Sequence, residues 1–287
     1  MLKTIRLATR KSQLALSQTE LVCDHLKSRF PGLACEVLPM STTGDRQQSW
    51  SLEEKGGKGL FTKELEDALL RGEADVAVHS AKDLPTELPN GLVICGFLPR
   101  EVANDVLVLK EGVEYPSVLA IGGPRRRAQI QRRFPNAAFI GMRGSVPTRL
   151  TKVAEGDGGA EGTVCAAAGL KRLGITEWPG VTFTHLSLEE MVPAVGQAAI
   201  AIECTSAMAD VFKNAFDAPT AQAVELERKF LKALGGGCQV AYAAHIENNN
   251  FHIFHHSVGY RAYPINLQDP AASQATLKAI LKDLNHG

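Results

Sequence analysis

The order of strand-like and helix-like segments constrains the fold most, because one alternating pattern occurs twice along the chain. The first copy predicts strands at 4–9, 35–42 and 74–80, a helix that follows Ser12, and a helix at about 61–71. Alternation of this kind is typical of a parallel sheet covered by helices. The N-terminal part is therefore predicted to form an α/β lobe.

The pattern restarts after about residue 103 and predicts a second α/β lobe. Its predicted elements are a strand at 118–123, a basic helix near 125–134, a strand at 137–144, a helix after Pro147 and the segment 163–170. Two lobes imply a cleft. A helix at 218–234, antiparallel strands around the turn ENNN and a last helix at about 271–284 predict a small α+β domain. The predicted domains are 1–98 with about 197–215, 103–192 and 218–287.

The composition indicates which classes of binding partner the chain does not favour. The 287 residues include 31 Lys and Arg and 31 Asp and Glu, so the formal net charge is zero and does not favour nucleic acid or an anionic membrane. The first residues lack the apolar core of a signal peptide, and no run of eighteen apolar residues occurs, which predicts a cytoplasmic protein. The six cysteines lack metal or redox spacing, so we expect reduced thiols and no metal site.

Polar side chains, most of them charged, gather where the predicted strands end. This group comprises Arg10, Ser12, Lys82, Asp83, Arg125, Arg126, Arg143, Arg149 and Arg172. Any one arginine fits a solvated helix surface, but their shared position at strand ends favours a cationic cleft. Guanidinium groups bind carboxylate or phosphate in a bidentate way, and aromatic residues are only 6% of the chain. We therefore expect a small ligand with several anionic groups.

Two motifs near this group allow more than one interpretation. In HSAKDLP, Asp83 can stabilise a cationic intermediate and move a proton, or form a structural ion pair. His79 beside it fits a packed histidine better than a base. GGKGLF lacks P-loop spacing, and fits either a mobile loop that carries Lys58 or a simple helix entry.

Three glycines precede Cys238 in GGGCQVA. Glycine permits positive φ and close approach to the backbone, so such a run can present the thiol to a bulky group. No histidine and amide constellation accompanies Cys238 as in a cysteine protease. A thiol that tethers a ligand permanently is the other interpretation.

Eight motifs together identify a family. The chain contains, in order, LATRKSQLAL, TTGD, GGKGLFTKELE, HSAKDLP, MRGSVPTRL, AAAGLKRLG, PAVGQAAIAIEC and GGGCQV. This ordered set resembles the porphobilinogen deaminase (hydroxymethylbilane synthase) family over nearly the whole chain. The resemblance implies an α/β fold with two lobes like those of periplasmic binding proteins, with mostly parallel sheets, and a small α+β C-terminal domain. It also implies a cytoplasmic monomer that acts in tetrapyrrole and heme biosynthesis.

The resemblance implies a reaction and a set of site residues. The family joins four porphobilinogen molecules head to tail into hydroxymethylbilane and releases ammonia, on a dipyrromethane cofactor that Cys238 would hold by a thioether. Asp83 would be catalytic, and Lys82, Arg125 and Arg126 would bind the cofactor with it. The implied substrate-binding residues are Arg10, Ser12, Lys58, Arg143, Arg149, Arg172 and Gln197.

The second lobe departs from the family pattern. IGGP at 121–124 replaces a Gly-Thr-Ser-Ser-like stretch, and AEGTVC at 160–165 replaces a more apolar segment, which predicts a glycine-weakened strand. Two alternatives therefore remain. One is a non-catalytic or weakly active paralogue that binds pyrroles or other polycarboxylates, and the other is an anion-binding module with an incidental cysteine.

Overall fold

The structure is a computed structural model, and it describes residues 3–46, 59–235 and 241–286. The chain divides into two compact units. The described residues of the first unit lie within 1–49, 57–101 and 196–222, and those of the second lie within 102–195 and 223–287. The first unit is thus assembled from segments far apart in the sequence.

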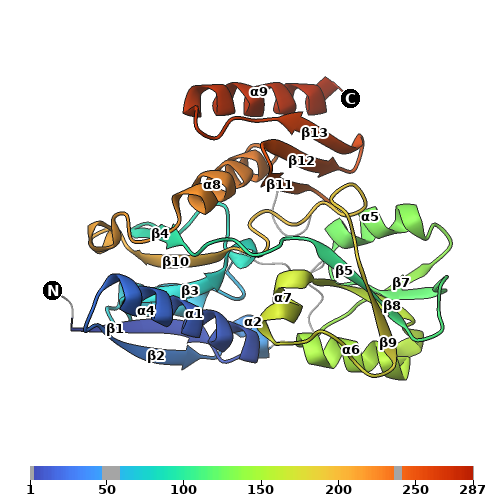
Figure 1. Cartoon of the computed structure of the whole chain (residues 1–287), viewed down its shortest axis with the longest axis horizontal. Coiled ribbons are helices and arrows are strands. Elements are labelled where there is room, and N and C mark those ends of the chain that lie inside the picture. Colours follow the sequence, from blue (N-terminus) through green and yellow to red (C-terminus); the bar gives the residue numbers. More distant parts are fainter. Residues whose placement is uncertain (1–2, 47–58, 236–240, 287) are drawn as a thin grey trace. The chain divides into compact units, whose positions relative to one another are not determined.

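The first unit contains a five-stranded sheet with the order β2-β1-β3-β10-β4 (Figure 1). Its described elements are β1 (Thr4–Arg10), α1 (Gln13–Arg29), β2 (Ala34–Met40), α2 (Thr43–Arg46), α4 (Lys63–Leu70), β3 (Val76–Ser80), the 3₁₀ turn η1 (Ala81–Asp83), β4 (Leu92–Phe97), β10 (Ile200–Thr205) and η3 (Ala209–Phe212). β1 runs parallel to β2 and β3, whereas β10 runs antiparallel to β3 and β4. The sheet is therefore mixed.

Helices cover both faces of this sheet, as the alternation predicts. Val22 and Leu26 of α1 pack against Leu7 of β1 on one face, and Leu65 of α4 packs against Ala8 on the other. Successive residues of a strand point to opposite faces, so β1 contributes to both cores. The N-terminus of α1 is capped as predicted, because the backbone N–H of Ala15 donates to Ser12 Oγ at 3.3 Å.

The second unit contains a five-stranded sheet with the order β7-β6-β8-β5-β9. Its described elements are β5 (Asp105–Lys110), β6 (Val118–Ala120), α5 (Pro124–Arg133), β7 (Ala138–Ile140), α6 (Val146–Glu155), η2 (Asp157–Gly159), β8 (Gly162–Ala166), α7 (Ala167–Arg172) and β9 (Val181–His185). β6 is parallel to β7 and β8, and β5 is antiparallel to β8 and β9. The two large sheets therefore share one topology.

A three-stranded antiparallel sheet follows in the same unit, with the order β11-β12-β13. It comprises β11 (Ala243–Glu247), β12 (Asn250–His255) and β13 (Gly259–Pro264), with the helices α8 (Ala218–Ala233) and α9 (Pro270–His286). Phe230 of α8, Phe251 of β12 and Ile280 of α9 share one fully buried core. The α+β character predicted for this region is confirmed, and the boundaries of three separate domains stay a prediction.

The mixed α/β class is confirmed, but the strand alternation did not indicate four of the strands. They are β4, β5, β9 and β10, and they make all the antiparallel pairings of the two large sheets. The expectation of mostly parallel sheets is confirmed, because four of the five strands in each large sheet run in one direction and only β10 and β5 run against them. β5 and β10 run antiparallel to their neighbours because neither follows a strand of its own sheet through a βαβ crossover. The chain reaches β5 directly from the first unit and β10 directly from the second unit.

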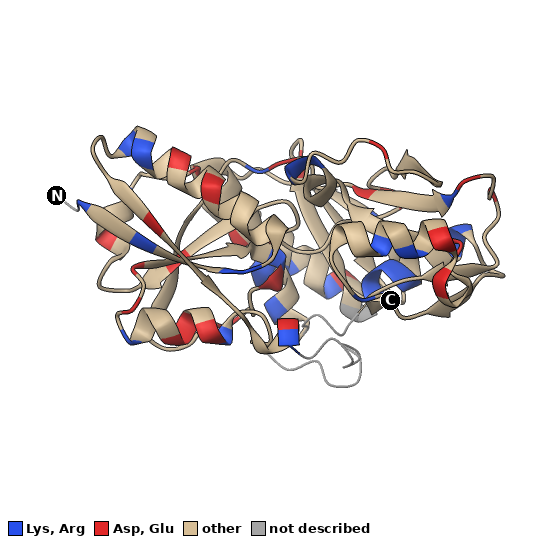
Figure 2. Ribbon diagram, turned by 90° about the horizontal axis from the view of Figure 1, so that it is seen from below, with Lys and Arg blue, Asp and Glu red and all other residues tan. Residues whose placement is uncertain are grey.

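Basic and acidic residues are interspersed on the helices of both units (Figure 2). Among the described residues, the helices are too short or too polar to span a membrane.

Candidate functional site

A pocket of about 90 Å³ lies in the first unit at the carboxyl end of β1 and β3. Its lining includes four residues of the predicted site, which are Arg10, Ser12, Lys82 and Asp83. They meet because β1 and β3 are parallel neighbours, so that the residues that follow both strands reach the same sheet edge. The structure thus confirms that these residues lie together, while their roles stay predictions.

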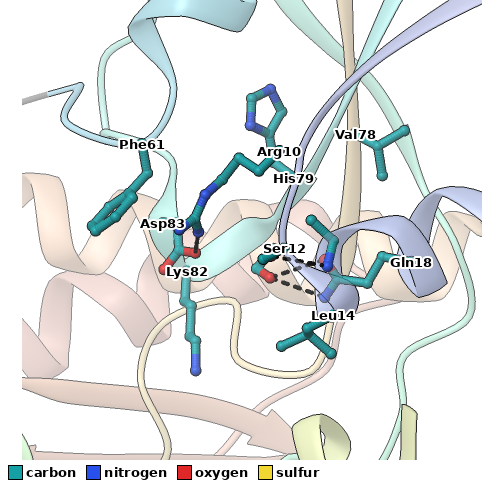
Figure 3. Close-up of a pocket in the computed structure, with 11 residues that line it drawn as sticks. Arg10, Ser12, Leu14, Gln18, Phe61, Val78, His79, Lys82 and Asp83 are labelled. Carbon is teal, nitrogen blue, oxygen red and sulfur yellow. Dashed lines mark hydrogen bonds and ion pairs between the residues drawn. The ribbon is translucent and has the colours of Figure 1, made fainter. Parts of the chain in front are cut away.

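Arg10 is the centre of the polar contacts in this pocket. Its guanidinium makes a bidentate ion pair with Asp45, with 3.2 Å between Nε and Oδ2, and its Nη1 lies 4.0 Å from Asp83 Oδ2. The guanidinium lies over the ring of Phe61, with Arg10 Cζ 4.4 Å from the ring centroid. Figure 3 shows Arg10 directed toward Asp83, with Lys82 extending away from both. Arg10 therefore connects the catalytic candidate to two residues that the sequence analysis did not select.

Asp45 is held as an anion by its surroundings. Partial burial by itself would raise the Asp45 pKa, but hydrogen bonds from Arg10 and Thr42 outweigh this effect and lower the pKa below its ordinary value. The Thr42 hydroxyl and backbone N–H both donate to Asp45 Oδ2, at 2.8 and 3.2 Å. The TTGD motif, which contains Asp45, was a signal that could have identified this residue.

Gln197 reaches the same sheet edge because β10 is antiparallel to β3. The N–H of Ala81 donates to the carbonyl of Ala199 at 3.0 Å, and Ile200 pairs with Ser80. Gln197 therefore precedes a strand that begins where β3 ends, and it is fully buried. The role of Gln197 as a site residue stays a prediction.

In the second unit, Arg125 and Arg126 share one buried carboxylate. Arg125 Nη2 lies 2.8 Å from Asp105 Oδ2, and Arg126 Nη2 lies 2.7 Å from Asp105 Oδ1. Asp105 is fully buried. Burial by itself would raise its pKa, but the two guanidinium groups prevail and lower the pKa to about 2. Asp105 is thus a third residue that the sequence analysis did not select.

The other predicted arginines of this unit also follow strands. Arg143 comes three residues after β7, Arg149 lies on α6 with its Nε donating to the Gly144 carbonyl at 2.9 Å, and Arg172 ends α7. All three side chains are half-buried. The carboxyl edge of β6, β7 and β8 is therefore rich in guanidinium groups.

The departures in this unit have local explanations. Gly122 approaches the Met142 carbonyl so closely that a Cβ would lie 2.8 Å from its oxygen, and Gly123 caps α5 with a φ of +119°. Thr163 of β8 is buried and donates to the Ala120 carbonyl at 2.6 Å. IGGP thus builds a tight strand-to-helix turn, and the polar side chain of Thr163 in β8 has a hydrogen-bond partner.

Two residues of the predicted site, Lys58 and Cys238, lie outside the described residues.

The fold and these side chains define an α/β protein with cationic side chains at the carboxyl edges of both large sheets. The family described as "Porphobilinogen deaminase, dipyromethane cofactor binding domain" matches residues 5–213. Porphobilinogen deaminase of Syntrophotalea carbinolica is 43% identical over 84% of this chain and 78% of the relative, and that of Syntrophomonas wolfei is 42% identical over 88% and 84%. The chain belongs to the porphobilinogen deaminase family.

Among solved structures, the periplasmic aliphatic sulphonate binding protein SsuA of Escherichia coli aligns with 99% of this chain and 88% of its own. The sequence identity is 11% and the TM-score 0.44.

Proposed function

We propose that this chain is a hydroxymethylbilane synthase that joins four porphobilinogen molecules head to tail and releases ammonia, in tetrapyrrole and heme biosynthesis. One observation carries the proposal. In this member of the family, Asp83 and Arg10 lie side by side in one pocket. The chain would act in the cytoplasm as a monomer. Retention of the charged residues at both sheet edges supports an active enzyme over a paralogue that only binds pyrroles.

The dipyrromethane cofactor carries carboxylates, and the residues present suit such a group. Arg126 Nε is buried and has no hydrogen-bond partner among the described residues, so it offers a donor to an acceptor beyond them. Arg125, Arg126, Lys82 and Asp83 would hold the cofactor, and Cys238 would attach it covalently. When bound, the cofactor supplies the primer to which the first substrate is joined.

The arginines would bind the acetate and propionate groups of porphobilinogen. Their planar guanidinium groups stay protonated and match carboxylates in a bidentate way. Arg10, Arg143, Arg149 and Arg172 would do this with Ser12, Lys58 and Gln197. Such binding orients the substrate, because charges fixed at several points leave it few orientations.

Asp83 would act on the reacting atoms. When the aminomethyl C–N bond of porphobilinogen breaks, ammonia leaves and positive charge develops on the pyrrole, which a carboxylate stabilises. A new C–C bond then forms, and the pyrrole carbon that made it loses a proton that Asp83 can accept. Arg10, which contacts both Asp83 and Asp45, would keep the Asp83 carboxylate in place.

The first test combines mass and turnover. Intact mass of the denatured wild-type chain should exceed the sequence mass by two deaminated porphobilinogen units, and Cys238→Ser should lack this surplus. Asp83→Asn should keep the surplus and lose turnover of porphobilinogen by at least about 100-fold, the scale of a proton-transfer group. Asp24→Asn, on the exposed side of α1, is the matched control and should retain full turnover. An unmodified wild-type mass that persists after incubation with porphobilinogen would favour the pyrrole-binding paralogue.

A further inference from the structure

The position of Asp105 follows from the direction of β5. Asp105 is the first residue of β5 and pairs with Ala166, the last residue of β8. Because these strands are antiparallel, the start of β5 lies at the sheet edge where the parallel strands end. α5, which carries Arg125 and Arg126, begins after β6 at this same edge. The topology therefore brings one acid to two arginines from a distant part of the sequence.

The geometry divides the Asp105 carboxylate between the two guanidinium groups. Each oxygen receives one arginine, at 2.8 Å from Arg125 and 2.7 Å from Arg126. Arg125 is fixed further, because its Nη1 donates to the Val192 carbonyl at 2.6 Å. A planar guanidinium that is hydrogen-bonded at one edge loses its freedom to rotate, so its remaining N–H groups have set directions.

The charges of this trio do not cancel. Two guanidinium groups and one carboxylate leave one positive charge, on arginine side chains that are only 12% and 11% exposed. A buried charge without a counterion is costly, so a purely structural ion pair would need only one of these arginines. The buried Arg126 Nε, unpartnered within the described part of the chain, points to the same deficit. One further anion would complete the group.

We propose that Asp105 is a positioning residue, which aligns Arg125 and Arg126 so that together they bind one carboxylate of a pyrrole in the proposed reaction. This inference rests on the proposed function and deepens it. Asp105 would not touch the substrate or the cofactor. Instead it would hold both guanidinium groups in a fixed geometry and reduce their mutual repulsion. Binding would then need no rearrangement of either arginine.

The test separates positioning from a structural role through KM and kcat. Asp105→Asn removes the charge at nearly constant volume, and Asp105→Glu keeps the charge but displaces it. Arg125 and Arg126 would hold the cofactor pyrrole to which porphobilinogen is joined, so a displaced pyrrole should form a poorer site for the incoming substrate. We expect Asp105→Asn to raise the KM for porphobilinogen about tenfold or more, with kcat per tethered chain within about threefold of wild type, because Asp83 is unchanged. Asp105→Glu should give a smaller rise. The tethered fraction, measured by intact mass, should be lowest in Asp105→Asn.

The matched control is Asp75→Asn, which breaks the ion pair of Arg6 and Asp75 (2.8 Å) away from the pocket. It should leave KM and the tethered fraction unchanged. Folded Asp105→Asn and Asp105→Glu with wild-type KM and tether would overturn the role of Asp105. A loss of activity that matches the loss of folded protein, with a wild-type KM in the molecules that fold, would also overturn it. If Asp105→Asn fails to fold, a wild-type KM in Asp105→Glu would overturn it. A wild-type chain with neither turnover nor tether would overturn the proposed function as well.

Discussion

Among single residues, two buried or half-buried carboxylates hold three of the predicted site arginines. Arg10 pairs with Asp45, and Arg125 and Arg126 share Asp105. The sequence identified the arginines by their position after strands, but it did not identify either acid as a partner. These acids let strongly basic groups stand close together in half-buried or buried positions without full charge repulsion. The arginines are thereby held in place before any ligand binds.

The ion pair of Asp105 should make stability depend on pH in the acid range. Its pKa is about 2 in the folded chain, below the ordinary value of 3.8, so the folded state binds the proton less tightly than the unfolded state. This contribution, about 2 kcal/mol, is fully present above about pH 5 and is lost as the pH falls toward 2. Urea unfolding from pH 7 to pH 3 should show the wild type losing its advantage over Asp105→Asn. A difference between the two that stays constant over this range would contradict the prediction.

At the scale of elements, β8 shows why a glycine in a central strand need not be a weakness. β8 lies between β6 and β5, and a Cβ on Gly162 would stand 2.6 Å from Leu109 Cδ2 and 2.8 Å from Leu119 Cδ2. The absence of a side chain therefore makes room for two buried leucines. The sequence pattern alone predicts weakness at this glycine, because it does not show which residues of the neighbouring strands face it.

Gly162→Ala should destabilise the second unit by about 1–3 kcal/mol, the usual cost of overpacking a core. The Val108 carbonyl, 3.0 Å from the added Cβ, belongs to the backbone and cannot rotate away as a leucine methyl can. Chemical denaturation measures the change. Gly141→Ala is the matched control, since a Cβ there meets nothing within 4 Å, and it should change stability by less than about 0.5 kcal/mol. Equal effects of the two substitutions would show that packing around β8 is not the cause.

At the scale of the whole molecule, the two large sheets have the same strand order and differ in how the chain supplies them. The second sheet is continuous in sequence, from β5 to β9. The first sheet needs β10, which comes after the second sheet in the chain and lies between β3 and β4. The first unit is therefore complete only after most of the chain has been made.

This difference predicts the behaviour of fragments. A fragment of residues 102–195 contains every strand of the second sheet and should fold, with a cooperative thermal transition. A fragment of residues 1–101 lacks β10, so β3 and β4 lose the strand that joins them, and Ile202 no longer fills the core with Leu7 and Val78. It should show little tertiary signal in near-UV circular dichroism. Cooperative folding of 1–101 alone would mean that β10 is dispensable.

The family and the α/β class were predictable from the sequence, because ordered motifs and strand–helix alternation are local properties of a chain. The sequence placed Arg10, Ser12, Lys82 and Asp83 together correctly, since parallel neighbouring strands end at one edge. The antiparallel direction of β5 and β10, which brings Asp105 and Gln197 to the sheet edges, was not predictable from the sequence. The direction of a strand depends on pairing between residues far apart in sequence, such as Asp105 with Ala166, and no local pattern encodes such a pairing.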